Sequence, residues 1–297
     1  MKPNKNEKTA EIVGMSLGDG SLTIRNDKKN KGLLRFQMRG HVEERIYYDQ
    51  YVKSLFDKHI GVVQITHYKG KNASYGICSE KNEVCRNLHY LGIPIGVKKE
   101  LQIPSWIKQN THHLRGFIRG FFDTDGSVFC GKDYNYPEKK HIKIRMSGVS
   151  ISFQFIKEIS QSLSHLGVHN LVIKPYKKND PRFGDINKIQ IDGPNVVNYF
   201  KIIGSHNPKH ITKYQVWTKF GFCPPHTTLK QRDMILEGKI DPTFYYEKNN
   251  KQNAGVAEPG QMRKSTVKNN MERLVEETSQ KPCPLVGARV RITSPAS

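Results

Sequence analysis

Residues 114–127 read Leu-Arg-Gly-Phe-Ile-Arg-Gly-Phe-Phe-Asp-Thr-Asp-Gly-Ser. The apolar residues from Phe117 to Phe122 predict a buried helix, yet glycines stand at positions 116 and 120. Each interior glycine costs a helix about 1 kcal/mol relative to alanine, so we expect a compensating contact. Glycine allows a second backbone to approach closely, as in helix pairs with small residues four positions apart. The helix should end at Asp125, with Gly126 as its C-terminal cap, which places a carboxylate at the end of a tightly packed helix.

A weaker copy of this stretch occurs at residues 11–21, which read Glu-Ile-Val-Gly-Met-Ser-Leu-Gly-Asp-Gly-Ser. Gly14 matches Gly120 and Asp19 matches Asp125, so both pairs are 106 residues apart (120 − 14 and 125 − 19). An internal repeat that keeps its spacing across unrelated sequence indicates two halves that are built alike.

Both stretches resemble the LAGLIDADG motif, and over about residues 8–225 the chain is similar to the monomeric, two-motif LAGLIDADG (DOD-type) homing endonucleases. Residues 12–20 and 118–126 occupy all nine motif positions. The first copy departs from the pattern at Leu17, where an acidic residue is common. The eighth position, which is the metal-binding acid of the family, is intact in both copies as Asp19 and Asp125.

The resemblance implies that the two motif helices pack against each other through Gly14, Gly18, Gly120 and Thr124. Asp19 and Asp125 would then lie side by side, with Gly18 and Thr124 completing the predicted metal-site positions. Two carboxylates at helix C-termini repel each other and raise each other's pKa unless a cation joins them. Hard divalent cations such as Mg²⁺ or Mn²⁺ suit oxygen ligands of this kind, and they support metal-assisted hydrolysis of phosphodiesters.

The alternative is that each aspartate only terminates its helix and binds turn amides. That alternative is the better interpretation of a single Asp-Gly pair, whereas the matched pair behind glycine-bearing helices favours the metal site. Asp123, at the sixth motif position, is expected to cap the partner helix rather than to bind metal.

Hydrophobic periodicity and turn-rich segments predict the order αββαββα twice, which is an α+β protein with two four-stranded antiparallel sheets. The resemblance implies that these sheets form a DNA-binding saddle around the two central helices. The expected domains are a first half at residues 8–92, a linker at 93–110, a second half at 111–225 and a C-terminal extension at 226–297. The extension is expected to be largely disordered beyond about residue 247, because its sequence is polar and lacks periodicity.

The chain has 48 lysines and arginines against 27 acidic residues, a formal net charge of +21. This excess favours a polyanionic partner, with nucleic acid ahead of an anionic membrane surface. No segment approaches the roughly 18 apolar residues of a membrane span. Since the N-terminus has no apolar signal region and the five cysteines form no CxxC pair, we expect free thiols in a reducing compartment. This compartment would be the cytoplasm, in association with the nucleoid, or the matrix of an organelle that encodes the protein.

Two-stranded ribbons fit the major groove of double-stranded DNA, where base edges can be distinguished. We expect basic and amide side chains on the four hairpins to contact DNA, with lysines mostly at phosphates. For any one of them a solvated face is an equally good interpretation. The predicted contacts are Arg25, Lys28, Arg35, Gln37, Arg39, His67, Lys69, Lys132, Lys143, Arg145, Lys174, Lys177, Lys178 and Arg182.

The family also places basic or amide residues near the metals. Lys81 and Lys188, near the fourth strand of each half, are the candidates for catalytic lysines. His112 and His113 are adjacent and would diverge on a helix, so we interpret them as linker or helix-start residues rather than a metal pair.

Two functions remain open at this level. The first is a site-specific double-strand DNA endonuclease with a long recognition site, acting as a monomer with internal pseudo-twofold symmetry and encoded by an intron or standing free. The second is a maturase that binds intron RNA on the same fold. An intein origin is disfavoured, because the chain begins with Met and ends in Pro-Ala-Ser. Retention of both aspartates favours the nuclease.

Overall fold

The structure is a computed structural model that describes residues 2–25, 32–70, 73–133, 140–176 and 186–246. Of residues 174–176 it describes the backbone alone. The predicted disorder beyond about residue 247 lies outside the described residues, as do the predicted DNA contacts Lys28, Lys177, Lys178 and Arg182 and the side chain of Lys174.

The first half begins with α1 (Glu7–Gly18), which Asn6 caps by accepting a hydrogen bond from the Thr9 amide. A hairpin of β1 (Gly20–Arg25) and β2 (Leu33–His41) follows. The chain then runs through a continuous helical segment of η1 (Val42–Glu44), α2 (Arg45–Tyr47), η2 (Tyr48–Val52) and α3 (Lys53–His59). The half closes with β3 (Gln64–Tyr68), β4 (Ser74–Ser79) and α4 (Asn82–Leu91).

The second half repeats this order with α6 (Thr111–Thr124), β5 (Gly126–Gly131), β6 (Lys143–Ser150), α7 (Phe153–His165), β7 (Leu171–Tyr176), β8 (Ile186–Asp192) and α8 (Pro194–Ile202). Asn110 caps α6 by accepting hydrogen bonds from the amides of His112 and His113. These two histidines therefore lie in the first turn of the helix, as expected. The predicted order αββαββα is confirmed in both halves.

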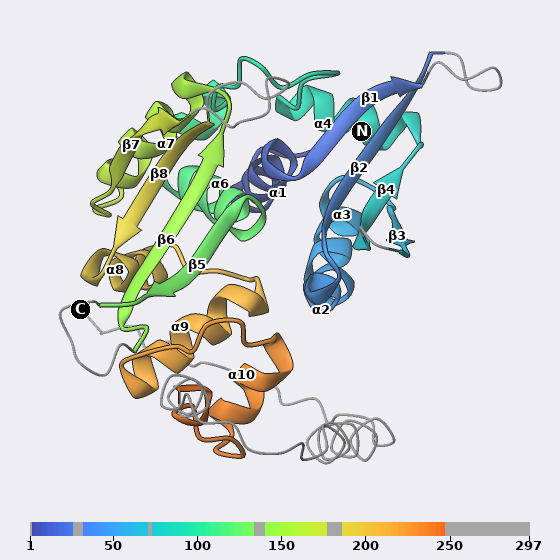
Figure 1. Cartoon of the computed structure of the whole chain (residues 1–297). Helices are drawn as coiled ribbons and strands as arrows, with labels where there is room; N and C mark the ends of the chain where they lie inside the picture. Colours follow the sequence, from blue (N-terminus) through green and yellow to red (C-terminus); the bar gives the residue numbers. More distant parts are fainter. Residues whose placement is uncertain (1, 26–31, 71–72, 134–139, 177–185, 247–297) are drawn as a thin grey trace, which may run out of the picture. The chain divides into compact units, whose positions relative to one another are not determined.

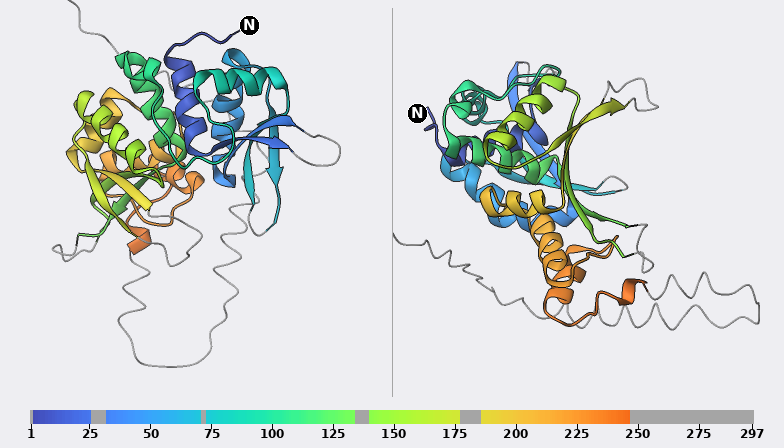
Figure 2. Two further views of the ribbon diagram at one scale, coloured as in Figure 1. Left: turned by 90° about the horizontal axis from the view of Figure 1, so that it is seen from above. Right: turned by 90° about the vertical axis from the view of Figure 1, so that its left-hand side faces the viewer.

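Each half contains a four-stranded antiparallel sheet, with strand orders β1-β2-β4-β3 and β5-β6-β8-β7. Helices cover one face of each sheet, and α1 and α6 lie side by side between the two sheets (Figures 1 and 2). Apolar residues such as Leu22, Phe36, Met146 and Ile189 are fully buried on the covered faces. The side chains that alternate with them stand on the opposite faces of the sheets.

Outside the repeat lie α5 (Ser105–Lys108) in the linker, α9 (Pro208–Phe220) and α10 (Leu229–Leu236). No sequence pattern predicts α10, which lies in the expected C-terminal extension. Its eight residues show little periodicity, but Thr228 caps the helix, and Ile235 packs in one cluster with Val216 of α9. Tertiary packing therefore stabilises a helix that its own pattern does not reveal. No helix within the described residues is both long and apolar enough to span a membrane.

The two motif helices approach each other through their glycines. A Cβ atom on Gly14 would lie 2.1 Å from the carbonyl oxygen of Phe117, and one on Gly120 would lie 2.1 Å from that of Glu11. Likewise, a Cβ atom on Gly18 would lie 2.3 Å from the hydroxyl oxygen of Thr124. The structure thus brings together the predicted interface residues, and the contact offsets what the glycines cost each helix.

Gly126 has a different role from the one expected. Its φ is not positive, so it is not a left-handed helix cap. Instead, a Cβ on Gly126 would lie 2.1 Å from the carbonyl oxygen of Phe122, because β5 turns sharply away from the last turn of α6. Close approach, rather than handedness, requires glycine at this position.

A Gly14→Ala substitution tests the helix contact. Alanine is the better helix former by about 1 kcal/mol, yet its Cβ would overlap backbone atoms that cannot move aside cheaply. We expect a net loss of about 1–3 kcal/mol in the free energy of unfolding, measured by urea denaturation. Gly131→Ala is the control, because a Cβ there meets nothing closer than 3.7 Å. A Gly14→Ala protein as stable as the wild type would disprove the close packing.

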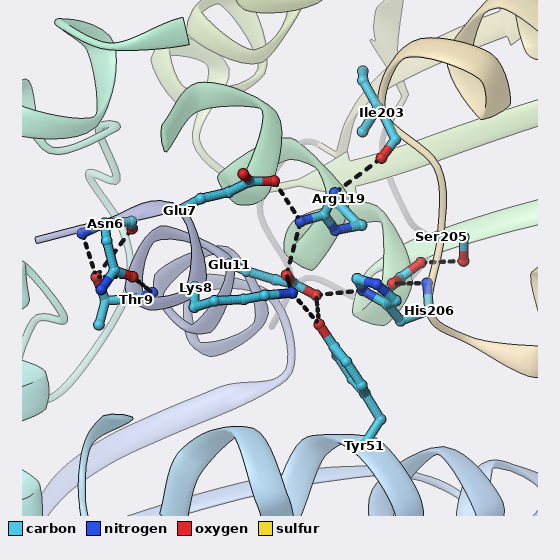
Figure 3. Close-up of polar contacts among 11 residues, drawn as sticks. Asn6, Glu7, Lys8, Thr9, Glu11, Tyr51, Arg119, Ile203, Ser205 and His206 are labelled. Atoms are coloured by element: carbon cyan, nitrogen blue, oxygen red, sulfur yellow. Dashed lines mark hydrogen bonds and ion pairs between the residues drawn. The ribbon is translucent and has the colours of Figure 1, made fainter. Parts of the chain in front are cut away.

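A buried ion network connects the halves farther up the same helices (Figure 3). Glu11 of α1 is fully buried and accepts hydrogen bonds from Arg119 Nη2 at 2.9 Å and the Tyr51 hydroxyl at 2.7 Å, and it contacts His206 Nδ1 at 2.7 Å. Arg119 of α6 also donates to Glu7 Oε1 and to the Ile203 carbonyl. Burial alone would raise the pKa of Glu11, but the His206 hydrogen bond and the Arg119 charge lower it to about 2.

Arg119→Met should destabilise the protein by about 3–5 kcal/mol, because it removes the guanidinium bound to the buried Glu11 carboxylate and leaves only His206 and the more distant Lys8 beside it. The double variant Glu11→Gln/Arg119→Met should recover part of this loss. Lys53→Met serves as the control, since it removes a surface pair with Asp57 that is worth no more than about 1 kcal/mol. Urea denaturation at pH 7 measures all three. A loss for Arg119→Met no larger than that of the control would contradict the network.

Candidate active site

The two motif acids stand in equivalent places at the ends of the central helices. Asp19 is the C-terminal cap of α1 with φ −78° and ψ −9°, and Asp125 is that of α6 with φ −79° and ψ −3°. A Cβ on Gly18 would lie 3.4 Å from the carboxyl carbon of Asp125. The two helix ends therefore touch, and the carboxyl groups of Asp19 and Asp125 are close enough for each to affect the ionisation of the other.

Two carboxyl groups in contact cannot both ionise easily. Burial, the Asp125 charge and the Glu44 charge raise the pKa of Asp19 to about 8. Burial also raises the pKa of Asp125, to about 6, against the opposing charge of Lys98. In the absence of a cation the pair thus retains a proton near neutral pH, and titrates as a unit.

The lysine at this site is Lys98, which the sequence analysis did not single out. Its Nζ donates to the carbonyl oxygens of Ser16 at 2.8 Å, Leu17 at 2.9 Å and Gly18 at 2.8 Å. The side chain therefore caps the C-terminus of α1, where a positive charge is favourable. Burial lowers the pKa of Lys98 to about 8, although Asp125 and Asp19 both act to raise it.

The linker delivers Lys98 to this place by pairing with the first sheet. Ile95 forms an isolated parallel bridge with Leu22 of β1, and the Gly96 amide donates to the Leu22 carbonyl at 2.8 Å. Since β1 starts directly after Asp19, this pairing holds the following residues at the end of α1. No periodicity in the linker signals such a contact.

The predicted lysines lie elsewhere, which corrects their assignment beside the aspartates. Met38 of β2 pairs with Gly20, the residue after Asp19, and also with Ile77 of β4. Ile77 is therefore the β4 residue level with the start of β1, whereas Lys81 follows the end of β4 and precedes α4. Lys188 lies on the uncovered face of β8, with its Nζ 5.8 Å from the centre of the Phe129 ring. Lys98 is the lysine whose charge acts on both carboxyl groups.

The end of α6 has a neutral cap where α1 has a charged one. Asn207, in the segment between α8 and α9, is fully buried and donates from Nδ2 to the Asp123 carbonyl at 2.8 Å and to Glu44 Oε1 at 3.0 Å. The Asp123 carboxylate accepts from the Ser205 hydroxyl and the His206 amide. Asp123 thus anchors the α8–α9 connection, not the partner helix as expected.

The predicted DNA contacts fall mostly on the uncovered faces of the sheets. Gln37 and Arg39 of β2 alternate with buried Phe36 and Met38, and the Arg39 guanidinium lies 3.7 Å from the centre of the Tyr68 ring. The further predicted residues on these faces are Arg25, Arg35, Lys143 and Arg145, whereas Lys69 and Lys132 follow the ends of β3 and β5. Several of these cations are held by acids, as Arg25 is by Glu80 at 2.6 Å and Arg145 by Asp192 at 3.1 Å.

His67 is the exception among these contacts. It pairs with Tyr75, a buried residue of β4, and the two rings are 5.6 Å apart. Because side chains alternate along a strand, His67 projects to the helix-covered side, and its neighbours Thr66 and Tyr68 take the uncovered face. His67 therefore lies on the other side of the sheet from the remaining predicted contacts, where it is exposed.

A model of the LAGLIDADG-like domain matches residues 112–204. Over these residues the chain is similar to the LAGLIDADG-like domain. Among solved structures, a variant of I-SmaMI is 14% identical, and the similarity covers 82% of this chain and 99% of that chain with a TM-score of 0.50. I-DmoI in complex with DNA and Mn is 20% identical, with coverage of 68% and 98% and a TM-score of 0.46. No curated protein sequence matches the chain.

The chemistry of the site formed by the two aspartates fits a hard divalent cation. Asp19 and Asp125 offer oxygen ligands from two helices, and their mutual repulsion leaves negative charge that a cation would neutralise. Gly18 and Thr124 adjoin the aspartates in the chain, but the Gly18 carbonyl accepts from Lys98 and the Thr124 hydroxyl donates to Gly120 and Phe121. The carboxyl groups are therefore the available ligands among the predicted positions.

A second group of acids has metal-like spacing but is occupied by protein donors. Ligand atoms of Glu11, Asp123 and His206 lie within 4.8 Å of one another. However, the Arg119 guanidinium binds Glu11 directly and would repel a cation. This group belongs to the ion network between the halves.

Asp19→Asn should stabilise the metal-free protein at pH 8. The pKa of Asp19 is about 8 in the folded protein, against an ordinary value of 3.8. Protonated Asp19 therefore contributes to the free energy of unfolding, and this contribution is fully present below about pH 4 and is lost as the pH rises through about 8. Asparagine keeps the shape of the side chain without its charge. We expect the free energy of unfolding at pH 8 to rise by at least about 1.4 kcal/mol, which is the energy of a shift of one pKa unit. Thermal unfolding in a chelator at pH 8 and pH 4 measures it.

At pH 4 the variant and the wild type should unfold at similar temperatures. Mg²⁺ or Ca²⁺ should raise the melting temperature of the wild type at pH 8 more than that of Asp19→Asn. Equal stability of the two proteins at both pH values would show that the carboxyl groups do not repel each other.

Proposed function

We propose that the protein is a site-specific double-strand DNA homing endonuclease that hydrolyses phosphodiester bonds with divalent metal ions held by Asp19 and Asp125. The observation that carries this proposal is the meeting of two half-buried carboxyl groups at the ends of α1 and α6, between two sheets with basic residues on their uncovered faces. I-SmaMI, whose fold the chain shares, is a meganuclease.

The sheets would bind and orient the substrate. Arginine and glutamine match the hydrogen-bonding edges of guanine and adenine in the major groove, and Arg35, Gln37 and Arg39 stand in alternation on β2. Acids such as Glu80 and Asp192 hold some of the arginines in place before DNA binds. Pre-ordering of this kind reduces the entropy lost on association.

The acids and Lys98 would form the chemical centre. Asp19 and Asp125 would hold Mg²⁺ or Mn²⁺, which when bound activates water and stabilises the leaving oxygen. Lys98 keeps a positive charge beside both carboxyl groups, and this charge favours a phosphate at the site. Its pKa of about 8 makes that charge sensitive to pH just above neutrality.

Cleavage of double-stranded DNA tests the proposal. A plasmid library with randomised duplex inserts is incubated with the protein and Mg²⁺, and the ends of linearised molecules are sequenced. We expect cuts at one family of related sites, and none in a chelator. Asp19→Asn and Asp125→Asn should abolish cutting while DNA affinity stays within about tenfold, because phosphate contacts supply most of that affinity.

The control is Asp241→Asn, which removes an exposed carboxylate that binds only its own loop. It should cut as the wild type does. Cutting by either motif variant would refute the metal site. If the wild type binds intron RNA but leaves every duplex intact, the maturase replaces the nuclease as the function.

A further inference from the structure

The uncovered face of the second sheet carries apolar side chains beside basic ones. Val149 of β6 is 37% exposed and Leu171 of β7 is 62% exposed. Their partners in β8 are Lys188 and Gln190, which precede and follow the fully buried Ile189. Because side chains alternate along a strand and paired residues share a face, Val149 and Leu171 point away from the helices.

Two further apolar residues share this face. Ile173 pairs with Lys188, and Phe129 of β5 pairs with Arg145; both apolar side chains are partly exposed. Lys188 connects them, because it pairs with Ile173 while its Nζ lies 5.8 Å from the centre of the Phe129 ring. The aliphatic part of a lysine adds apolar surface of its own. We call Phe129, Val149, Leu171 and Ile173 the apolar set.

The two sheets can be aligned through the strands that follow the motifs. Ser21 and Ser127 occupy matching positions directly after the motif glycines. Ser21 pairs with Gln37 in the first sheet, and Ser127 pairs with Ser147 in the second. Residues at the same distance from these two pairs are therefore equivalent.

An ion pair recurs at equivalent positions of this alignment. In the first sheet Arg35 Nε lies 3.6 Å from Glu80 Oε1. In the second sheet Arg145 Nε lies 3.1 Å from Asp192 Oδ1. The recurrence supports the alignment, so differences between the sheets can be assigned residue by residue.

Around the shared ion pair the two sheets differ in one direction. The first sheet has polar residues at all four equivalent positions, namely Arg39 for Val149, Gln64 for Leu171, Thr66 for Ile173 and Thr23 for Phe129. The first sheet thus presents hydrogen-bonding groups where the second presents hydrocarbon. Four changes of the same kind on one face indicate that this face of the second sheet meets a different chemical surface.

The charges around the apolar set favour DNA as that surface. Lys143, Arg145 and Lys188 lie on the same face, in a chain with a formal net charge of +21, so a polyanion is attracted to it. In the major groove of DNA, thymine presents a methyl group that apolar side chains contact. RNA offers no such partner, because uracil lacks the methyl group and the deep, narrow major groove of an RNA helix excludes side chains.

We propose that the apolar set reads thymines, by contact with their methyl groups in the major groove of the half of the target that lies along the second sheet. The proposal rests on the proposed function, because it takes double-stranded DNA as the partner. It assigns base specificity to four residues that are not among the predicted DNA contacts.

The test begins with a binding selection in a chelator, which prevents metal-dependent cutting. The full chain retains duplexes from a randomised library, and their sequences give a consensus. We expect thymines to be enriched in one half of that consensus. Synthetic duplexes then carry deoxyuridine in place of thymine in one half at a time, which removes only the methyl groups.

Each deoxyuridine at a contacted position should weaken binding about two- to fivefold, as expected for the loss of one buried methyl group. The same replacement in the other half, which lies along the polar first sheet, should change the affinity far less. Titration of labelled duplexes measures both dissociation constants.

Val149→Ser and Val172→Ser are a matched pair of variants. The two valines belong to one sheet and are 37% and 40% exposed, but Val172 pairs with buried Ile189 and so lies on the opposite face. Val149→Ser should abolish the deoxyuridine penalty at one position, whereas Val172→Ser should discriminate as the wild type does. Both should unfold as the wild type does, since substitutions at exposed positions change stability little.

Leu171→Gln copies the equivalent Gln64 of the first sheet. Glutamine pairs with the major-groove edge of adenine, so this variant should exchange a thymine preference for an adenine preference at one position of the consensus. Repeating the binding selection with the variant measures the change.

Equal binding of thymine and deoxyuridine duplexes by the wild type would overturn the proposal and leave the nuclease standing. A deoxyuridine penalty that survives both Val149→Ser and Leu171→Gln would also overturn it. A selection that yields no consensus would reject site-specific DNA binding, and with it both the proposed function and the reading of thymines.

Discussion

The contact between the backbones of α1 and α6 is the constraint on which the rest of the structure depends. Glycines at Gly14 and Gly120 bring each helix against carbonyl oxygens of the other. Once the axes are this close, residues at matching positions of the two helices must meet, and the final positions are Asp19 and Asp125. The raised pKa values of these acids therefore follow from helix packing about one turn away.

Ionisable side chains meet at two levels along the contact between α1 and α6. At one level Glu11 meets Arg119 and His206, and the network is neutralised within the protein. At the ends of the helices the three acids Asp19, Asp125 and Glu44 face Lys98, and Lys209 lies 3.8 Å from Glu44, so negative charge remains. The interface thus has one level at which the buried charges are neutralised within the protein, and this level holds the halves together. At the other level negative charge is left over, which suits an added cation.

The sequence was sufficient for features that depend on periodicity. The two motifs, their constant spacing and the alternating strands predicted both helices, both sheets and the meeting of Asp19 with Asp125. Features that depend on register or on irregular segments were missed. The projection of His67 follows from its pairing with Tyr75, and the place of Lys98 follows from a single bridge between Ile95 and Leu22. Likewise Asn207 contacts Glu44 and Asp123 across long chain separations that no local pattern records.

The residues that cap the two motif helices come from the segments that follow each half, and they differ in charge. Lys98 precedes the second half and Asn207 follows it. A homodimer of identical half-chains would have the same cap twice, and hence two equal half-sites. Joining the halves into one polypeptide removes that restriction, so each half-site can acquire its own protonation behaviour by ordinary point mutation.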